Sequence, residues 1–168
     1  MVDYDGERAG FSWATARRSL DGLPGGRGLN IAHETVDRHA AGPRSSRIAL
    51  RWLGRDGATQ DITYAQLRDA TNRFANVLAG LGVAAGDRVF LLSGRIPVLY
   101  VALLGALKHR CTVTPLFSAF GPEPIATRIG LGAGKVLVTT TSLYRRKVES
   151  IRPTLGSVEH VLLVRDDE

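Results

Sequence analysis

The chain has 168 residues, of which 44% are hydrophobic and 23% are charged, and its formal net charge is +6. This composition is typical of a globular domain with enough apolar material for a core, and no apolar run reaches the roughly 20 residues that cross a bilayer. The first seven residues are acidic and polar and lack the apolar centre of a signal peptide. We therefore expect a cytoplasmic protein with no membrane partner.

The positive charge would permit an anionic partner, such as nucleic acid or a phosphorylated cofactor. The basic residues are spread along the chain, however, so we expect no specific nucleic-acid partner. The single cysteine, Cys111, lies in an apolar strand pattern and is expected to be a buried, inert thiol. The His and Cys residues do not have the spacing of a metal site, and none is predicted.

Residues 1–46 show little periodicity and are expected to form an N-terminal extension with short helices. A short helical pattern runs from Phe11 to Leu20, and a glycine-rich connection follows at 22–28. Asn30 is placed to cap a helix over 31–40. The residues of this helix that are expected to face inward are Ile31, Ala32 and Val36.

Two short strands, at 48–52 and 60–63, flank an Asp-Gly turn at 54–57, and this pattern predicts a β-hairpin. Thr63, followed three residues later by Gln66, forms a capping box that opens the next helix. Glycines at 80 and 82 close this helix. The apolar face is expected to contain Leu67, Ala70, Phe74, Val77, Leu78 and Leu81.

From residue 87 onward, predicted strands and helices alternate. The strands are expected at 87–92, 112–116, 135–139 and 158–164, and the helices at 97–108, 122–131 and 143–153. This alternation predicts an α/β fold with a doubly wound, mostly parallel sheet and flanking helices. Only charged residues follow the last strand, so we expect the sheet to be incomplete.

The segment Gly130–Lys135 has the superficial look of a phosphate-binding loop. A Walker A motif needs a glycine where Ile129 stands and a hydroxyl where Val136 stands, and it should follow a strand rather than precede one. The glycine spacing of a dinucleotide-binding fold also fails. We therefore interpret this segment as a helix C-cap and turn. There is no Gly-x-Ser-x-Gly nucleophile elbow either.

The stretch 115–125 links a buried strand to a helix that begins at Pro122. It holds two phenylalanines and three small residues, which could offer an aromatic face and let backbone approach a ligand. Loops at the carboxyl ends of strands are where open α/β sheets bind ligands. A plain hydrophobic connection would produce the same pattern.

The densest basic run, Tyr144–Lys147, follows the carboxyl end of the next strand. It could be the solvated start of a helix, or it could bind a phosphate on the same sheet edge as the 115–125 loop.

The order and spacing of several short segments resemble the N-terminal part of AMP-forming acetate–CoA ligases, the acetyl-CoA synthetases of the acyl-adenylate-forming superfamily. The segments are Leu29–Glu34, Val36–His39, Thr63–Leu67, Asn72–Ala75, Gly86–Val89, Pro97–Tyr100, Gly105–Lys108 and Phe117–Pro124. By this resemblance, residues 47–168 form part of the N-terminal domain of the adenylate-forming fold.

The resemblance implies a ligase that uses ATP and Mg to activate acetate, or another short carboxylate, as an acyl-adenylate, from which coenzyme A then takes the acyl group. The family's Thr/Ser/Gly-rich phosphate loop ending in Pro-Lys and its C-terminal lysine have no counterpart in these 168 residues. No catalytic residue is therefore assigned, and the chain is expected to be an inactive fragment on its own.

One binding role can be carried over by resemblance. In acetyl-CoA synthetases, a loop of one aromatic and small residues lies against the adenine nucleotide of coenzyme A, and it matches Phe117, Ser118 and Ala119. A Gly-x-Arg-x-x-Arg motif one βα unit later meets the phosphate, and its first arginine falls on Arg145. The second falls on Val148, so Arg146 or Lys147 would have to replace it. The predicted coenzyme A site is thus partial.

A different class of function is also compatible with these residues. The chain could be a non-catalytic α/β module that binds a nucleotide or a partner protein and pairs with a separately encoded remainder, because an incomplete sheet leaves an edge free for pairing.

Overall fold

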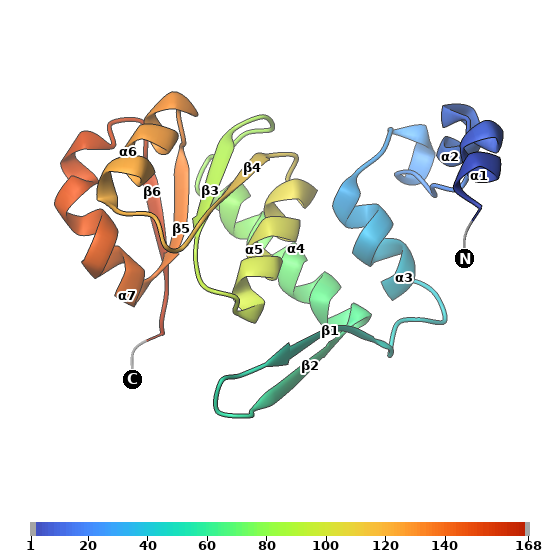
Figure 1. The fold of residues 1–168 in the computed structure, drawn as a ribbon, viewed down its shortest axis with the longest axis horizontal. Helices are drawn as coiled ribbons and strands as arrows, with labels where there is room; N and C mark the ends of the chain where they lie inside the picture. The colour runs from blue at the N-terminus through green and yellow to red at the C-terminus, as the bar shows by residue number, and fades with distance from the viewer. Residues whose placement is uncertain (1–2, 167–168) are drawn as a thin grey trace.

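A four-stranded sheet forms the centre of the computed structural model, which describes residues 3–166 (Figure 1). All neighbouring strands are parallel, and their order is β4-β3-β5-β6. The strands are β3 (Arg88–Leu92), β4 (Thr112–Leu116), β5 (Val136–Thr140) and β6 (His160–Val164). The predicted α/β fold with a parallel sheet is confirmed. The first two residues and the last two, Asp167 and Glu168, lie outside the described residues.

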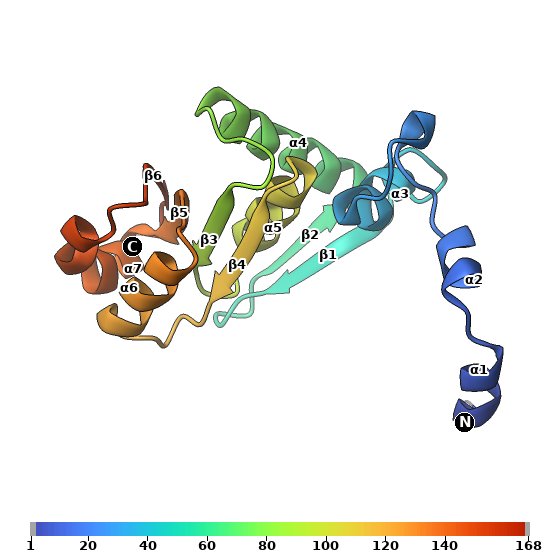
Figure 2. The ribbon, with the colours of Figure 1, turned by 90° about the horizontal axis from the view of Figure 1, so that it is seen from above.

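Helices cover both faces of this sheet (Figures 1 and 2). On one side lie α4 (Tyr64–Gly80) and α5 (Pro97–Lys108), and on the other lies α6 (Pro122–Leu131). Beside α6 runs a composite helix of three parts: α7 (Thr141–Leu143), the π-helical turn η3 (Tyr144–Val148) and the 3-10 helix η4 (Glu149–Thr154). The helix predicted at 143–153 is thus confirmed, although its hydrogen-bonding pattern changes along its length. Pro153, within η4, cannot donate the hydrogen bond that an α-helix needs there.

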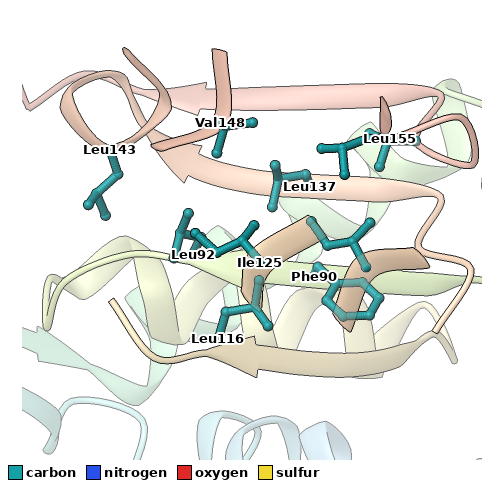
Figure 3. Packing of buried hydrophobic residues seen from close by; sticks show 10 residues of the cluster. Phe90, Leu92, Leu116, Ile125, Leu137, Leu143, Val148 and Leu155 are labelled. Atoms are coloured by element: carbon teal, nitrogen blue, oxygen red, sulfur yellow. The ribbon is translucent and has the colours of Figure 1, made fainter. Parts of the chain in front are cut away.

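Alternation along the central strands creates two separate cores. Phe90, Leu92 and Leu137 pack against Ile125 and other residues of the α6 side, as Figure 3 shows. Their neighbours in sequence face the opposite side. The residues of that second core include Val89, Leu91, Val136 and Val138 from the sheet and Leu78, Ala102, Ala106 and Cys111 from its surroundings. Cys111 is buried as predicted, and burial raises the pKa of its thiol.

Helix α4 begins with the predicted capping box: the Thr63 hydroxyl accepts from the Gln66 amide, and the Gln66 side chain accepts from the Thr63 amide. Leu67 and Leu78 are buried as expected, but Val77 is wrongly predicted, because 48% of it is exposed. The buried stripe instead passes through Thr71 and Ala75. Small residues are needed in this stripe because α5 packs closely against it. A Cβ added to Gly105 of α5 would be 2.9 Å from the Thr71 carbonyl oxygen.

The predicted hairpin is present as β1 (Ile48–Leu53) and β2 (Thr59–Thr63), which pair antiparallel. Its turn is closed by the Gly57 amide, which donates to the Gly54 carbonyl over 3.1 Å. The hairpin is tied to the carboxyl edge of the parallel sheet, because the Trp52 indole donates to the Arg95 carbonyl over 2.7 Å.

The N-terminal part projects away from the sheet (Figure 2). It contains α1 (Tyr4–Gly10), α2 (Trp13–Arg18), the 3-10 turn η1 (Pro24–Gly26), the π-helical turn η2 (His33–Asp37) and α3 (Arg38–Ala40). Helix α1 was not predicted, because it buries no residue and so has no apolar period; the Asp3 carboxylate caps it instead. Asn30 caps the helix at 31–40 as expected, because its side-chain oxygen accepts from the Ala32 amide over 2.9 Å. Ile31 is wrongly predicted to face inward, since 60% of it is exposed.

A polar junction attaches this part to the α4–α5 layer. The Lys108 ammonium donates to Asp37 over 2.7 Å, to Thr71 over 3.0 Å and to Asn72 over 2.7 Å. The side-chain amide of Asn30, through Nδ2, also donates to the Leu107 carbonyl over 2.9 Å. The Lys108 and Asp37 side chains are partly buried, so their ion pair is less exposed to screening than one on an open surface.

The glycine-rich segment at 130–135 is the helix end that the sequence predicts. Gly132 caps α6, and the Gly134 amide donates to the Ile129 carbonyl over 3.0 Å. The glycines are needed for packing, because a Cβ at either Gly132 or Gly134 would lie 2.5 Å from the Phe90 ring.

Replacing Gly134 with alanine therefore tests the packing of Phe90. The new methyl group meets a buried ring, so we expect Gly134→Ala to lower the free energy of unfolding by about 1–3 kcal/mol in urea denaturation. Gly130→Ala is the matched control in the same segment, because nothing lies within 4 Å of its added Cβ. Alanine favours the helix there and should leave stability equal or higher by up to about 1 kcal/mol. Equal stability of the two variants would contradict this packing.

Candidate functional site

The order of the strands places a natural binding position between β3 and β5. The chain passes from β3 to β4 on one side, and then crosses back to β5 on the other side of β3. The connections that leave β3 and β5 therefore diverge, and the space between them at the carboxyl edge is where open parallel sheets bind ligands.

An open hollow of about 300 Å³ lies at this position. Each of the four strands sends its carboxyl-end connection there: β3 through Gly94 and Ile96, β4 through Ser118, β5 through residues 140–147 and β6 through Asp166. The lining residues are Gly94, Ile96, Ser118, Thr140, Ser142, Leu143, Arg146, Lys147 and Asp166.

The predicted loop after β4 stands at the rim of this hollow. Ser118 lines it, whereas Phe117 and Ala119 are exposed beside it. Phe117 is 65% exposed, and its ring meets the ring of Phe120 edge to face, with 5.6 Å between the centroids. Phe120 is held in turn by the Arg128 guanidinium, whose carbon is 4.2 Å from the ring centroid. The loop thus presents an aromatic face that the protein itself leaves uncovered.

The predicted basic residues are divided by the structure. Arg146 lines the hollow, and its Nε donates to the Ser142 carbonyl over 3.1 Å, which leaves its terminal nitrogens for other partners. Arg145 is exposed and does not line the hollow. Val148, where the second arginine of the motif would fall, is fully buried in the core. The structure therefore brings together Ser118 and Arg146, and leaves Arg145 to one side.

Several lining residues were not predicted from the sequence. Thr140 caps α7, because its hydroxyl accepts from the Leu143 amide over 3.3 Å. Asp166 accepts from the Ser142 amide over 2.9 Å and also from the Ser142 hydroxyl. A usable signal was available: each of these residues stands at, or within two residues of, the end of a strand. Burial alone would raise the pKa of Asp166, but hydrogen bonds from Ser142, together with those from Thr140 and the Asp166 amide, hold the pKa below the ordinary 3.8.

Within residues 3–166, no group of three or more His, Cys, Asp or Glu side chains is arranged to hold a metal ion. In the same range, no helix is both long enough and apolar enough to cross a membrane. The chemistry available at the hollow is thus hydrogen bonding from hydroxyl and amide groups, positive charge from Arg146, and stacking on Phe117.

Comparison with known proteins gives a consistent result. The model of the AMP-binding enzyme family matches residues 36–168. Acetyl-coenzyme A synthetase of Streptomyces coelicolor is 36% identical over 82% of this chain and 22% of that protein. The Bacillus subtilis acetyl-coenzyme A synthetase is 35% identical over 98% of the chain and 28% of its own length.

Among solved structures, the chain resembles an acyl-CoA synthetase of Brucella canis. The TM-score is 0.81 and the sequence identity 32%, and the match covers 100% of this chain and 30% of that structure. The chain thus spans less than a third of the length of each of these three relatives.

The Asp166 bridge predicts a dependence of stability on pH. Because its pKa is lowered by folding, Asp166 stabilises the folded state above its ordinary pKa, and this contribution is lost as the pH falls through its lowered value. The difference in unfolding free energy between the wild type and Asp166→Asn should be below about 1 kcal/mol near neutral pH, because the residue is exposed, and should shrink below about pH 4.

Urea denaturation of the wild type and of Asp166→Asn, at pH values from neutral to below about 4, measures this difference in unfolding free energy. Asp5→Asn removes the same charge from an exposed position in α1 and serves as the control. A difference that grows as the pH falls would contradict the assignment.

Proposed function

The chain belongs to the AMP-binding enzyme family, and from that premise we propose that it forms part of the coenzyme A site of an AMP-forming acyl-CoA ligase. In the proposed reaction, Mg-bound ATP and a short carboxylate give an acyl-adenylate and pyrophosphate. Acetate is the first candidate for the carboxylate. The thiol of coenzyme A then takes the acyl group and releases AMP. Similarity to two acetyl-coenzyme A synthetases supports acetate.

The observation that carries this proposal is the pair of residues at the hollow between the carboxyl ends of β3 and β5. An exposed aromatic ring, at Phe117, and a guanidinium that lines the hollow, at Arg146, come from neighbouring βα units of one sheet edge. An aromatic face and a positive charge are what an adenine nucleotide with a phosphate requires.

Each predicted residue has a separate task in this proposal. Phe117 stacks on the adenine ring, and the small side chains of Ser118 and Ala119 let the nucleotide approach the backbone. Arg146 contacts the nucleotide's phosphate, and Arg145, which is exposed on the same turn, adds positive charge near it. A guanidinium suits this task because it stays charged and can donate two parallel hydrogen bonds.

We further propose that these 168 residues carry none of the adenylation chemistry. A Thr/Ser/Gly-rich loop ending in Pro-Lys is absent from them. A second candidate function follows from the edge strand β6, where Leu163 is 51% exposed. A strand with an exposed apolar side chain on a sheet edge could pair with a separately encoded chain that carries the remaining motifs.

Phe117→Ala should weaken the binding of coenzyme A to the chain. Loss of one base–aromatic stack typically costs about 1–3 kcal/mol, so we expect roughly a 5- to 150-fold increase in Kd by isothermal titration calorimetry. Phe11→Ala removes an exposed phenylalanine from the N-terminal part and serves as the control. Equal affinity of Phe117→Ala and the wild type would overturn the stacking role.

The chain alone should release no pyrophosphate when it is given acetate, ATP and Mg, measured by a coupled pyrophosphate assay. Robust acetate-dependent turnover would contradict the proposed division of labour. If turnover appears only after a separately produced chain with the missing motifs is added, the second candidate function is supported.

A further inference from the structure

Lys147 lies on the composite helix, where it contacts the 117–121 loop through two hydrogen bonds to backbone carbonyls. Its ammonium donates to the Ser118 carbonyl over 2.6 Å and to the Phe120 carbonyl over 2.9 Å. Both acceptors belong to the loop that carries the exposed Phe117 ring. These are charge-assisted hydrogen bonds, which are about twice as strong as neutral ones.

The loop has few other constraints of its own. Inside it, the Phe120 amide donates to the Phe117 carbonyl over 3.0 Å, which makes one turn. At its end, Gly121 is the N-cap residue of α6, and no side chain caps this helix. The Ser118 and Phe120 carbonyls converge on the same ammonium group, so Lys147 satisfies two acceptors that the turn leaves free.

The form of the composite helix explains why this lysine faces the loop. Lys147 lies in η3, where the Glu149 amide donates to the Tyr144 carbonyl five residues earlier, as in a π-helix. Within this wide turn, Val148 is fully buried in the core and Arg145 and Arg146 are exposed. The exposure of Lys147 is intermediate, because its side chain is partly buried against the loop.

We propose that Lys147 is a positioning residue, which fixes the 117–121 loop in the conformation that presents the Phe117 ring, and that it is not a ligand of the nucleotide's phosphate. As far as coenzyme A is concerned, this inference rests on the proposed function. A phosphate could recruit Lys147 only by competing with two short bonds to backbone carbonyls. Arg146, whose terminal nitrogens are not used in this way, is the better phosphate ligand.

The conformation of the loop can be tested without any ligand. The readout is the hydrogen-exchange rate of the Phe120 amide, measured by NMR on the full chain, because that amide closes the turn. Lys147→Met keeps an apolar stem but removes the ammonium, and we expect at least about a tenfold faster exchange. Lys147→Arg keeps donors and should restore most of the protection. Arg145→Met, in the same turn, should leave the rate unchanged.

The role toward the ligand is tested with coenzyme A and with 3′-dephospho-coenzyme A, titrated into each variant. A positioning residue affects both ligands equally, so Lys147→Met should raise both Kd values by the same factor, about tenfold or more. A residue that binds the 3′-phosphate affects only coenzyme A, because 3′-dephospho-coenzyme A lacks this group and keeps the 5′-diphosphate. Arg146→Met is expected to follow this second pattern.

The outcomes separate the two levels of the proposal. Unchanged exchange at Phe120 in a folded Lys147→Met variant, or a loss of affinity confined to the 3′-phosphate, overturns the positioning role. Faster exchange, restored by Lys147→Arg, supports it even if the wild type does not bind coenzyme A, and in that case the proposed function fails while the positioning role stands. If Lys147→Met does not fold, the comparison is made with Lys147→Gln, to which the same criteria apply.

Discussion

Burial of the β3–β5 pair on both faces is the constraint on which the rest of the structure depends. Phe90 faces the α6 side and its neighbours Val89 and Leu91 face the α4–α5 side, so helices have to cover both faces. Parallel strands also require long crossovers, and these return the chain to the amino edge before each new strand. Every connection that leaves a strand therefore starts at the same carboxyl edge. The hollow between β3 and β5 is a consequence of this arrangement.

The parts of the fold that were predictable are those in which the local pattern and the tertiary packing agree. Pro97–Lys108 and Pro122–Leu131 have the predicted bounds, because a proline begins each helix and a turn follows each one. Val77 was predicted incorrectly, since helical spacing alone does not show which of two adjacent apolar stripes meets another helix. Gly105 decides this question by allowing α5 to approach α4 at Thr71, and it lies 34 residues away in the sequence. Such a long-range contact leaves no local signal.

The candidate site shows a similar division. Strand-end loops were correctly expected at one edge, because topology requires it. The roles of individual basic residues could not be predicted, because they depend on the phase of the turn after β5. A count along the motif places its second arginine on Val148, which the wide turn η3 directs into the core. Arg146, two residues before it, lines the hollow, and Lys147 binds the loop. The phase of this turn thus separates a buried side chain, Val148, from one that lines the hollow, Arg146.

Ser118 and Ala119 raise a related point about rigidity. Glycines in such a loop would let backbone approach a nucleotide, but they would also add conformational freedom that binding must remove. Residues with a Cβ restrict the loop, and Lys147 restricts it further by holding two of its carbonyls. The aromatic pair of Phe117 and Phe120 acts in the same direction, since Arg128 covers the second ring. These contacts are all internal to the chain, so one wall of the site can be ordered before any other wall is present. A preorganised wall loses less entropy when a nucleotide binds, and this favours binding even at an open hollow.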